Sequence, residues 1–177
     1  MGPTVRELCP WYALNVKHQH EFAVRAALEY QGCEVFLPTC RVKKRWSDRV
    51  KQIEMPLFGG YVFVRFPAEQ RIAVLETPGV FHTVNFLGRP AAIPESEIET
   101  LRRAIASALP LRPWPQLEPG TRVRIERGPL RGVEGVLLRE KEGYQLVIGV
   151  EMLRRFVAVE LAPEMVSAIS EPALQLA

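Results

Sequence analysis

The stretch Met55-Pro-Leu-Phe-Gly-Gly-Tyr-Val-Phe-Val-Arg-Phe66 does most to decide the fold of this 177-residue chain. A Gly-Gly pair stands directly before an apolar run of β-branched and aromatic residues, which predicts a sharp turn into a buried strand. Phe58 and Tyr61 flank the glycines, so two rings lie on a loop where backbone can approach a partner closely. The alternative is that both rings are core packing beside a tight turn.

The elements around this stretch alternate between strand and helix over residues 9–108. Alternating apolar residues predict a short strand at Trp11–Val16, and helices are expected over about 18–31 and 69–76. A last helix begins near Pro94, because proline suits a first helical turn. Further strands are expected over residues 35–37, 61–66 and 80–86. The economical arrangement is an α+β domain in which an antiparallel sheet is flanked by helices.

A proline-rich segment divides the chain. Pro110-Leu-Arg-Pro-Trp-Pro115 carries three prolines in six residues, a density that is typical of an extended connector and disfavours sheet ladders. We therefore expect a linker over residues 109–117. Residues 118–168 hold four short alternating strands separated by glycine-bearing turns, which predicts a small β-barrel, with residues 169–177 as a tail.

Charge is concentrated in one segment of the first domain. Residues 41–51 contain six basic residues, one acidic residue and Trp46. Such a cluster fits a strand pair that attracts phosphate through Lys43, Lys44 and Arg45. A solvated hairpin face is the equally simple alternative.

Composition excludes several classes of protein. No stretch approaches membrane-spanning length, and three cysteines without a Cys-x-x-Cys pair indicate free thiols, so we expect a cytoplasmic protein without membrane contact. No catalytic motif is present, and a zinc site built from Cys33, Cys40 and the His18/His20 pair matches no common ligand spacing. We expect no enzyme activity, no metal and no cofactor, although Cys33 or Cys40 beside His82 would formally allow a nucleophile pair.

Motifs along the whole chain resemble the NusG family of transcription elongation factors. In the first domain they are Trp11-Tyr12, Phe36-Leu-Pro-Thr39, Leu57-Phe58…Gly60-Tyr61-Val62, Thr77-Pro-Gly-Val80 and Gly88-Arg-Pro90…Ile93-Pro94. The stretch Glu118-Pro-Gly-Thr-Arg-Val-Arg-Ile-Glu-Arg-Gly-Pro-Leu-Arg-Gly-Val-Glu-Gly-Val136 is similar to the KOW motif that opens the second domain of the family. The resemblance covers residues 9–168. It implies an NGN-like domain at 9–108 followed by an SH3-like KOW barrel at 118–168.

The resemblance also implies partners. In the family an aromatic-rimmed depression holds the clamp helices of the largest RNA polymerase subunit, and the residues at the matching positions here are Trp11, Phe58 and Tyr61. A few rigid aromatics can supply most of the energy of such a helix-in-groove contact. Gly59 stands where the family usually has proline, which loosens the loop.

A second set of implied partners concerns the KOW domain. The general factor of the family contacts Rho or a ribosomal protein through the loop that here contains Met152, Leu153 and Arg154. Leu153 replaces a typical aromatic and Arg154 a frequent glycine, which favours a specialised, operon-specific branch. That branch reads non-template DNA with a surface that includes the start of the first helix, where this chain has Lys17, His18 and His20.

Two expectations complete the sequence interpretation. The chain is expected to be a monomer whose β-barrel is joined by an independent linker, leaving the surface of Trp11, Phe58 and Tyr61 open. The competing function is a ribosome- or RNA-binding KOW protein without polymerase contact. Residues 118–177 argue against it, since their eight basic and nine acidic residues leave no excess to neutralise RNA phosphate.

Overall fold

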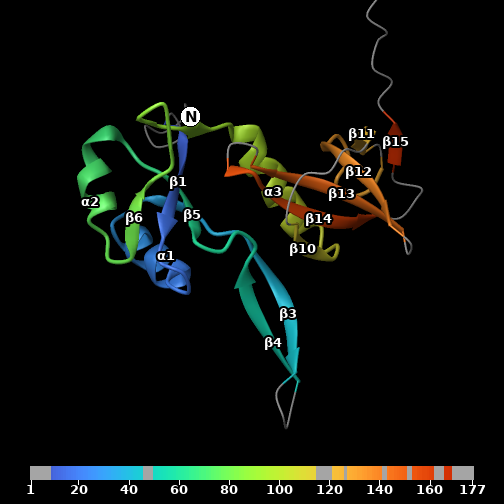
Figure 1. Ribbon diagram of the computed structural model, residues 1–177, viewed down its shortest axis with the longest axis horizontal. Coiled ribbons are helices and arrows are strands. Elements are labelled where there is room, and N and C mark those ends of the chain that lie inside the picture. The colour runs from blue at the N-terminus through green and yellow to red at the C-terminus, as the bar shows by residue number, and fades with distance from the viewer. Residues whose placement is uncertain are drawn as a thin grey trace, which may run out of the picture.

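The computed structural model describes residues 9–45, 50–114, 121–125, 127–140, 143–150, 153–161 and 166–168. An N-terminal and a C-terminal antiparallel sheet lie at opposite sides of helix α3 (Glu95–Ala106) (Figure 1). A two-stranded hairpin of β3 (Thr39–Arg45) and β4 (Val50–Pro56) projects away from both sheets (Figure 1). The described residues are mostly strand, with three α-helices and one short 3₁₀ helix. The expected α+β arrangement of the first domain is confirmed.

The N-terminal sheet is built around β1 (Trp11–Val16) and β5 (Tyr61–Arg65), which pair antiparallel with Asn15 opposite Tyr61. Its strand order is β2-β5-β1-β6, and β9 pairs with the beginning of β1 beside β6. The strand expected at Trp11–Val16 has those bounds. The remaining strands of this sheet are β2 (Glu34–Phe36), β6 (Val80–Thr83) and β9 (Ala92–Ile93).

Helices cover both faces of the N-terminal sheet. Helix α1 (Glu21–Tyr30) buries Val24 and Leu28 in one apolar cluster, and α2 (Arg71–Leu75), preceded by η1 (Ala68–Gln70), adds Val74 to it. Helix α3 (Glu95–Ala106) packs on the opposite face with Ile98, Leu101 and Ala104, and Pro94 stands at its N-cap as expected. The same strands therefore contribute side chains to two apolar clusters, because alternate side chains point to opposite faces of a sheet.

Two hairpins extend from this domain. The basic segment forms β3 (Thr39–Arg45) and β4 (Val50–Pro56), in register from Thr39 opposite Pro56 to Arg45 opposite Val50. A shorter hairpin joins β7 (Asn85–Phe86) to β8 (Arg89–Pro90). The β3–β4 hairpin projects furthest from the body of the molecule (Figure 1).

The C-terminal sheet has the order β10-β14-β13-β12-β11-β15. All pairings recorded for the described residues are antiparallel, as the alternating pattern predicted. These pairings form one ladder from β10 to β15, and the closed KOW barrel stays a prediction. The strands are β10 (Leu111–Trp114), β11 (Thr121–Ile125), β12 (Glu134–Glu140), β13 (Gly143–Val150), β14 (Arg155–Leu161) and β15 (Val166–Ala168).

The expectation that prolines would keep residues 111–114 out of a sheet ladder was wrong. Leu111–Trp114 pairs with β14, and Pro113 lies opposite Val157. Strand β10 is at the end of the strand order, where a residue without an N–H group is tolerated. The segment thus adds an edge strand to the C-terminal sheet.

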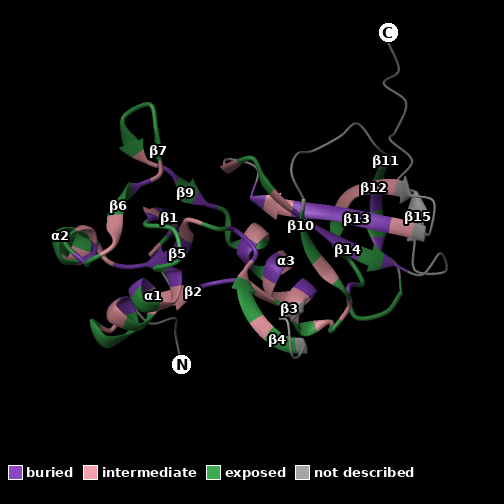
Figure 2. Cartoon of the chain, turned by 60° about the horizontal axis from the view of Figure 1, so that its bottom comes forward, coloured by how far each residue is buried: buried purple, intermediate pink, exposed green. Residues whose placement is uncertain are grey.

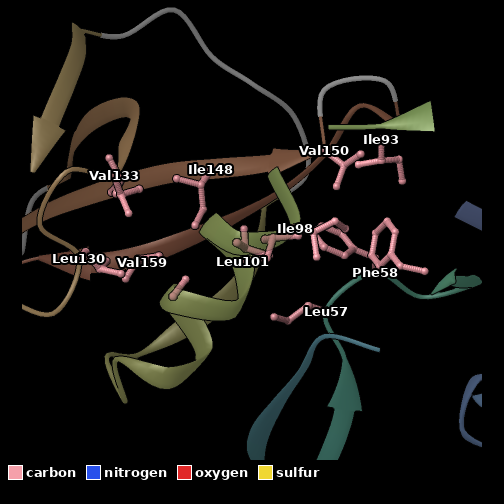
Figure 3. Packing of buried hydrophobic residues seen from close by; sticks show 14 of the residues in the cluster. Leu57, Phe58, Ile93, Ile98, Leu101, Leu130, Val133, Ile148, Val150 and Val159 are labelled. Atoms are coloured by element: carbon pink, nitrogen blue, oxygen red, sulfur yellow. The ribbon is translucent and has the colours of Figure 1, made fainter. Parts of the chain in front are cut away.

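Helix α3 also packs against β13, so the two sheets share one core. The apolar cluster runs from Trp11 and Phe63 in the N-terminal sheet to Ile148 and Val159 in the C-terminal sheet. Figure 3 shows Val150 at the end of β13 beside Ile93 of β9, with Ile98 and Leu101 of α3 below the same sheet. In Figure 2 the buried residues run through the region where α3 meets the C-terminal sheet. The expected independence of the two domains is therefore contradicted.

Candidate functional site: an aromatic turn beneath the C-terminal sheet

Residues 58–61, called the aromatic turn below, connect β4 to β5. The Tyr61 N–H donates to the Phe58 carbonyl at 3.1 Å, which closes a four-residue turn. Gly60 has φ +81°, the left-handed value that the third residue of a type II turn requires. The sequence rule that a Gly-Gly pair marks a sharp entry into a strand is confirmed, and glycine is needed at position 60.

Two other elements hold the aromatic turn. The Val16 N–H, at the end of β1, donates to the Gly60 carbonyl at 2.9 Å, and the Gly60 N–H donates to a carboxylate oxygen of Glu21 at 2.8 Å. Both backbone polar groups of Gly60 are therefore satisfied by neighbouring elements. The turn is attached to β1 and to the start of α1, which limits its freedom to move.

The two rings of the turn have different environments. Phe58 is 2% exposed and meets Phe63 edge to face, with ring centroids 5.8 Å apart. Tyr61 is half-buried, and the Arg155 guanidinium lies over its ring at 5.5 Å. Phe58 is thus part of the core in this conformation, whereas Tyr61 lies at its margin.

Trp11 is buried by its own domain. Its indole N–H donates to Glu95 at 3.0 Å, and the guanidinium groups of Arg65 and Arg102 lie 4.7 and 5.2 Å from its ring. Arg65 is also ion-paired to Glu95 and, at 3.3 Å, to Glu34. This network joins β1, β5, β2 and α3, so Trp11 positions α3 and is not available to a partner in this conformation.

The C-terminal sheet covers the aromatic surface, so the expectation of an open surface was wrong. Arg155 of β14 lies over the Tyr61 ring, and Leu153 packs against the apolar cluster that contains Phe58 and extends through both sheets. Arg103 of α3 donates a hydrogen bond to the Arg131 carbonyl in the loop before β12. The physical reason is that β13 is buried on both faces: residues 145–148 are all buried, so one face requires a cover outside its own sheet.

An open groove lies along the contact between α3 and the C-terminal sheet. The groove has a volume of about 660 Å³, and Arg103 and Thr100 of α3 line one side of it. Arg122 and Arg124 of β11 line the opposite side. Because charged side chains line this groove, the contact between α3 and the C-terminal sheet is polar along this edge, as contacts between separable domains commonly are.

The candidate nucleic-acid residues fall in two places. Lys17, His18 and His20 are exposed at the start of α1, and His18 lies 3.6 Å from Glu21, beside the aromatic turn. The backbone of Lys43, Lys44 and Arg45 lies in β3, but their side chains and Trp46 are outside the described residues. Side-chain positions are therefore described for the first of the two basic sets, and the role of the second stays a prediction.

The candidate loop for a second partner precedes β14. Leu153 is half-buried in the shared core, and Arg154 is exposed with φ +49°. That left-handed conformation is the one in which glycine is favoured. Met152 lies outside the described residues. In this conformation Leu153 is partly withdrawn from solvent by the shared apolar cluster.

Two further features bear on chemistry. Burial raises the pKa of the Cys40 thiol. Among the residues that the structure describes, no group of three or more His, Cys, Asp or Glu side chains is placed to hold a metal ion. Within the same ranges, no helix has the length and apolar character needed to cross a membrane.

A family model described as "Transcription termination factor nusG" matches residues 10–102, more than half of the chain. The chain belongs to the NusG family. This family consists of non-enzymatic transcription factors, so the expected lack of enzyme activity is confirmed by family membership. The matched residues include β1, the aromatic turn and most of α3.

Curated relatives and a solved structure agree with the family match. The chain is 28% identical over 170 residues to the "Transcription termination/antitermination protein NusG" of Pseudomonas aeruginosa, covering 85% of this chain and 93% of the relative. It is 25% identical over 150 residues to the protein of the same name from Campylobacter jejuni, covering 78% of this chain and 82% of that relative. A structure described as "Domain interaction in Thermotoga maritima NusG" matches 91% of this chain and 97% of its own with a TM-score of 0.56 and 22% identity, which supports the NusG-like fold.

Proposed function

We propose that this protein is a transcription elongation and antitermination factor that binds the clamp helices of the largest RNA polymerase subunit through Phe58 and Tyr61. The observation that carries the proposal is the aromatic turn, which lies inside the NusG-matched region and presents Tyr61 at the edge of the core. The turn is held at Gly60 from two sides, so its rings are preorganised. Preorganised aromatics are the usual anchors of helix-in-groove contacts.

The proposal requires the C-terminal sheet to move. Arg155 covers the Tyr61 ring and both sheets share the apolar cluster that contains Phe58, so the described conformation is the closed one. The open, charged groove along the contact between α3 and the C-terminal sheet supports a separable contact. Polymerase binding then competes with the internal contact.

Release of the sheet would expose a second docking loop. We propose that residues 118–168 act as a KOW domain, whose Met152, Leu153 and Arg154 then recruit Rho or a ribosomal protein. Leu153 is half-buried against the shared apolar cluster in the closed state. Leucine and arginine at these positions support assignment to the operon-specific branch. One movement would thus make both docking surfaces available.

Nucleic acid is the third proposed partner. Lys17, His18 and His20 are exposed at one edge of the aromatic turn and are proposed to face non-template DNA. The projecting β3–β4 hairpin carries Lys43 and Lys44, and a basic ribbon of this kind suits phosphate contact (Figure 1). Phosphate contacts position a protein without reading sequence, so the hairpin would add affinity to any elongation complex.

The test is polymerase binding by ring-deletion variants of the full chain. Tyr61→Ala should weaken binding by roughly 2–4 kcal/mol if Tyr61 is an anchor. Tyr30→Ala is the matched control, since Tyr30 is 95% exposed on α1 and distant from the turn. Phe58→Ala must be compared at equal folded fraction, because truncating a buried Phe costs about 3–5 kcal/mol of stability. Folded Tyr61 and Phe58 variants that bind polymerase like the Tyr30 control would end the proposal.

A further inference from the structure

Glu21 is a charged residue buried beneath the aromatic turn, with 2% of its surface exposed. We propose that Glu21 is the positioning residue of the polymerase-binding surface, setting the turn so that Phe58 and Tyr61 are presented together. This inference rests on the proposed function, because it assigns a role within that same surface. Nothing in the sequence pattern singles out Glu21, which has the character of an ordinary first-turn acidic residue of a helix.

A buried carboxylate is costly unless its oxygens are hydrogen-bonded, so its contacts indicate its use. The hydrogen bond recorded for Glu21 is made with the Gly60 N–H, 2.8 Å away and 39 residues along the chain. The His20 side chain makes no capping bond to α1, and Glu21 begins that helix. Glu21 stands in the first turn of α1, where the positive end of the helix dipole favours a negative side chain, and a carboxylate is a strong acceptor for a backbone amide.

The Gly60 N–H is the group that decides the conformation of the turn. With φ +81°, the amide of Gly60 is aimed away from the β5 ladder and towards α1. If the carboxylate were absent, this amide would be left without its partner, and the turn could rotate to expose it to water. Because Tyr61 follows directly and Phe58 closes the turn, such a rotation would change the relative placement of both rings.

The exposed His18 ring lies beside both the Glu21 carboxylate and the aromatic turn. Its Nδ1 lies 3.6 Å from the Glu21 carboxylate, and a Cβ added at Gly59 would meet the His18 ring at 3.6 Å. The imidazole therefore lies against both the carboxylate and the turn, with its side chain 77% exposed. Glu21 is thus held between α1, His18 and the aromatic turn, where it can transmit a small displacement of the helix start to Tyr61.

The experiment compares four full-length variants by two readouts. Glu21→Gln keeps an oxygen that can accept from Gly60, Glu21→Ala removes it, and Glu21→Asp keeps the charge but withdraws the oxygen by one methylene. Glu29→Ala is the matched control, because Glu29 is a half-exposed glutamate on the same helix, paired with Arg25. The readouts are amide exchange at Gly60 by nuclear magnetic resonance and affinity for purified RNA polymerase.

We expect Gly60 exchange in Glu21→Ala to accelerate about tenfold to a hundredfold, the range that corresponds to removal of a hydrogen bond to a charged group. Polymerase affinity should fall by a similar factor. Glu21→Gln should stay within about threefold of wild type in both readouts. Glu21→Asp should behave like Glu21→Ala, and it replaces that variant if alanine prevents folding.

Two results would overturn the inference. One is Gly60 protection in Glu21→Ala or Glu21→Asp that equals wild type. The other is loss of polymerase affinity in Glu21→Gln as large as in Glu21→Ala despite retained Gly60 protection. If the wild-type chain does not bind polymerase at all, the proposed function fails, and the exchange measurement alone decides whether Glu21 positions the turn.

Discussion

Removing the two side chains that hold the C-terminal sheet on the aromatic turn should strengthen polymerase binding. Leu153 is half-buried at the margin of the shared core, so its truncation should cost the closed state about 1–2 kcal/mol, less than a fully buried leucine. Arg155 lies 5.5 Å from the Tyr61 ring centroid at an exposed position, where a cation–π contact contributes about 0.5–1 kcal/mol. Together the two changes should destabilise the closed state by about 2 kcal/mol.

That destabilisation converts directly into affinity. When the closed state predominates, apparent affinity is proportional to the open fraction, so about 2 kcal/mol should raise polymerase affinity by roughly 30-fold. The assay is titration of purified polymerase with wild type and with the Leu153→Ala/Arg155→Ala variant. Arg154→Ala, which removes an exposed adjacent charge, is the control. Faster amide exchange along β13 in the double variant, without a gain in polymerase affinity, would refute the reasoning.

Three further predictions address the turn, the C-terminal sheet and the hairpin. Gly59→Pro should raise the free energy of unfolding by about 0.4–1 kcal/mol, measured in urea, because proline suits the second position of this turn and a Cβ there meets His18 at an ordinary 3.6 Å. Gly135→Ala should destabilise the protein by roughly 1–3 kcal/mol, since its Cβ would lie 2.7 Å from the Val147 carbonyl; a melting temperature equal to wild type would contradict this. Neutralising Lys43, Lys44 and Arg45 should lower the salt dependence of elongation-complex binding by about one unit of log–log slope for each phosphate that the hairpin no longer neutralises, and an unchanged slope would leave the hairpin as a solvated face.

The elements of the fold were largely predictable from local patterns. The alternation in Trp11–Val16, the Gly59-Gly60 turn and the proline before α3 each determine a structure within a few residues. Strand β10 was missed because three prolines in six residues indicate a connector. Proline is tolerated in an edge strand, but the edge that β10 occupies is formed by β14, about 45 residues further along the chain, and local sequence does not reveal it.

The contact between the sheets was not predicted, although β13 carried a signal for it. A strand covered on one face alternates apolar and polar residues, whereas residues 145–148 are all buried, and Leu146, Val147 and Ile148 form a continuous apolar run. The run indicates burial on both faces but does not say what covers the second face. The aromatic residues were identified from family resemblance, while Glu21 could not be, because its role depends on a hydrogen bond across 39 residues.

Hydrogen exchange of the full chain in complex with RNA polymerase tests the central claim most directly. The account predicts that amides of residues 57–62 become more protected, because polymerase covers the aromatic turn. It also predicts that amides of β13 and β14 exchange faster, because the C-terminal sheet has left α3. Unchanged exchange over residues 57–62, with protection confined to the C-terminal sheet or the β3–β4 hairpin, would contradict the account and favour a protein that does not bind polymerase through this surface.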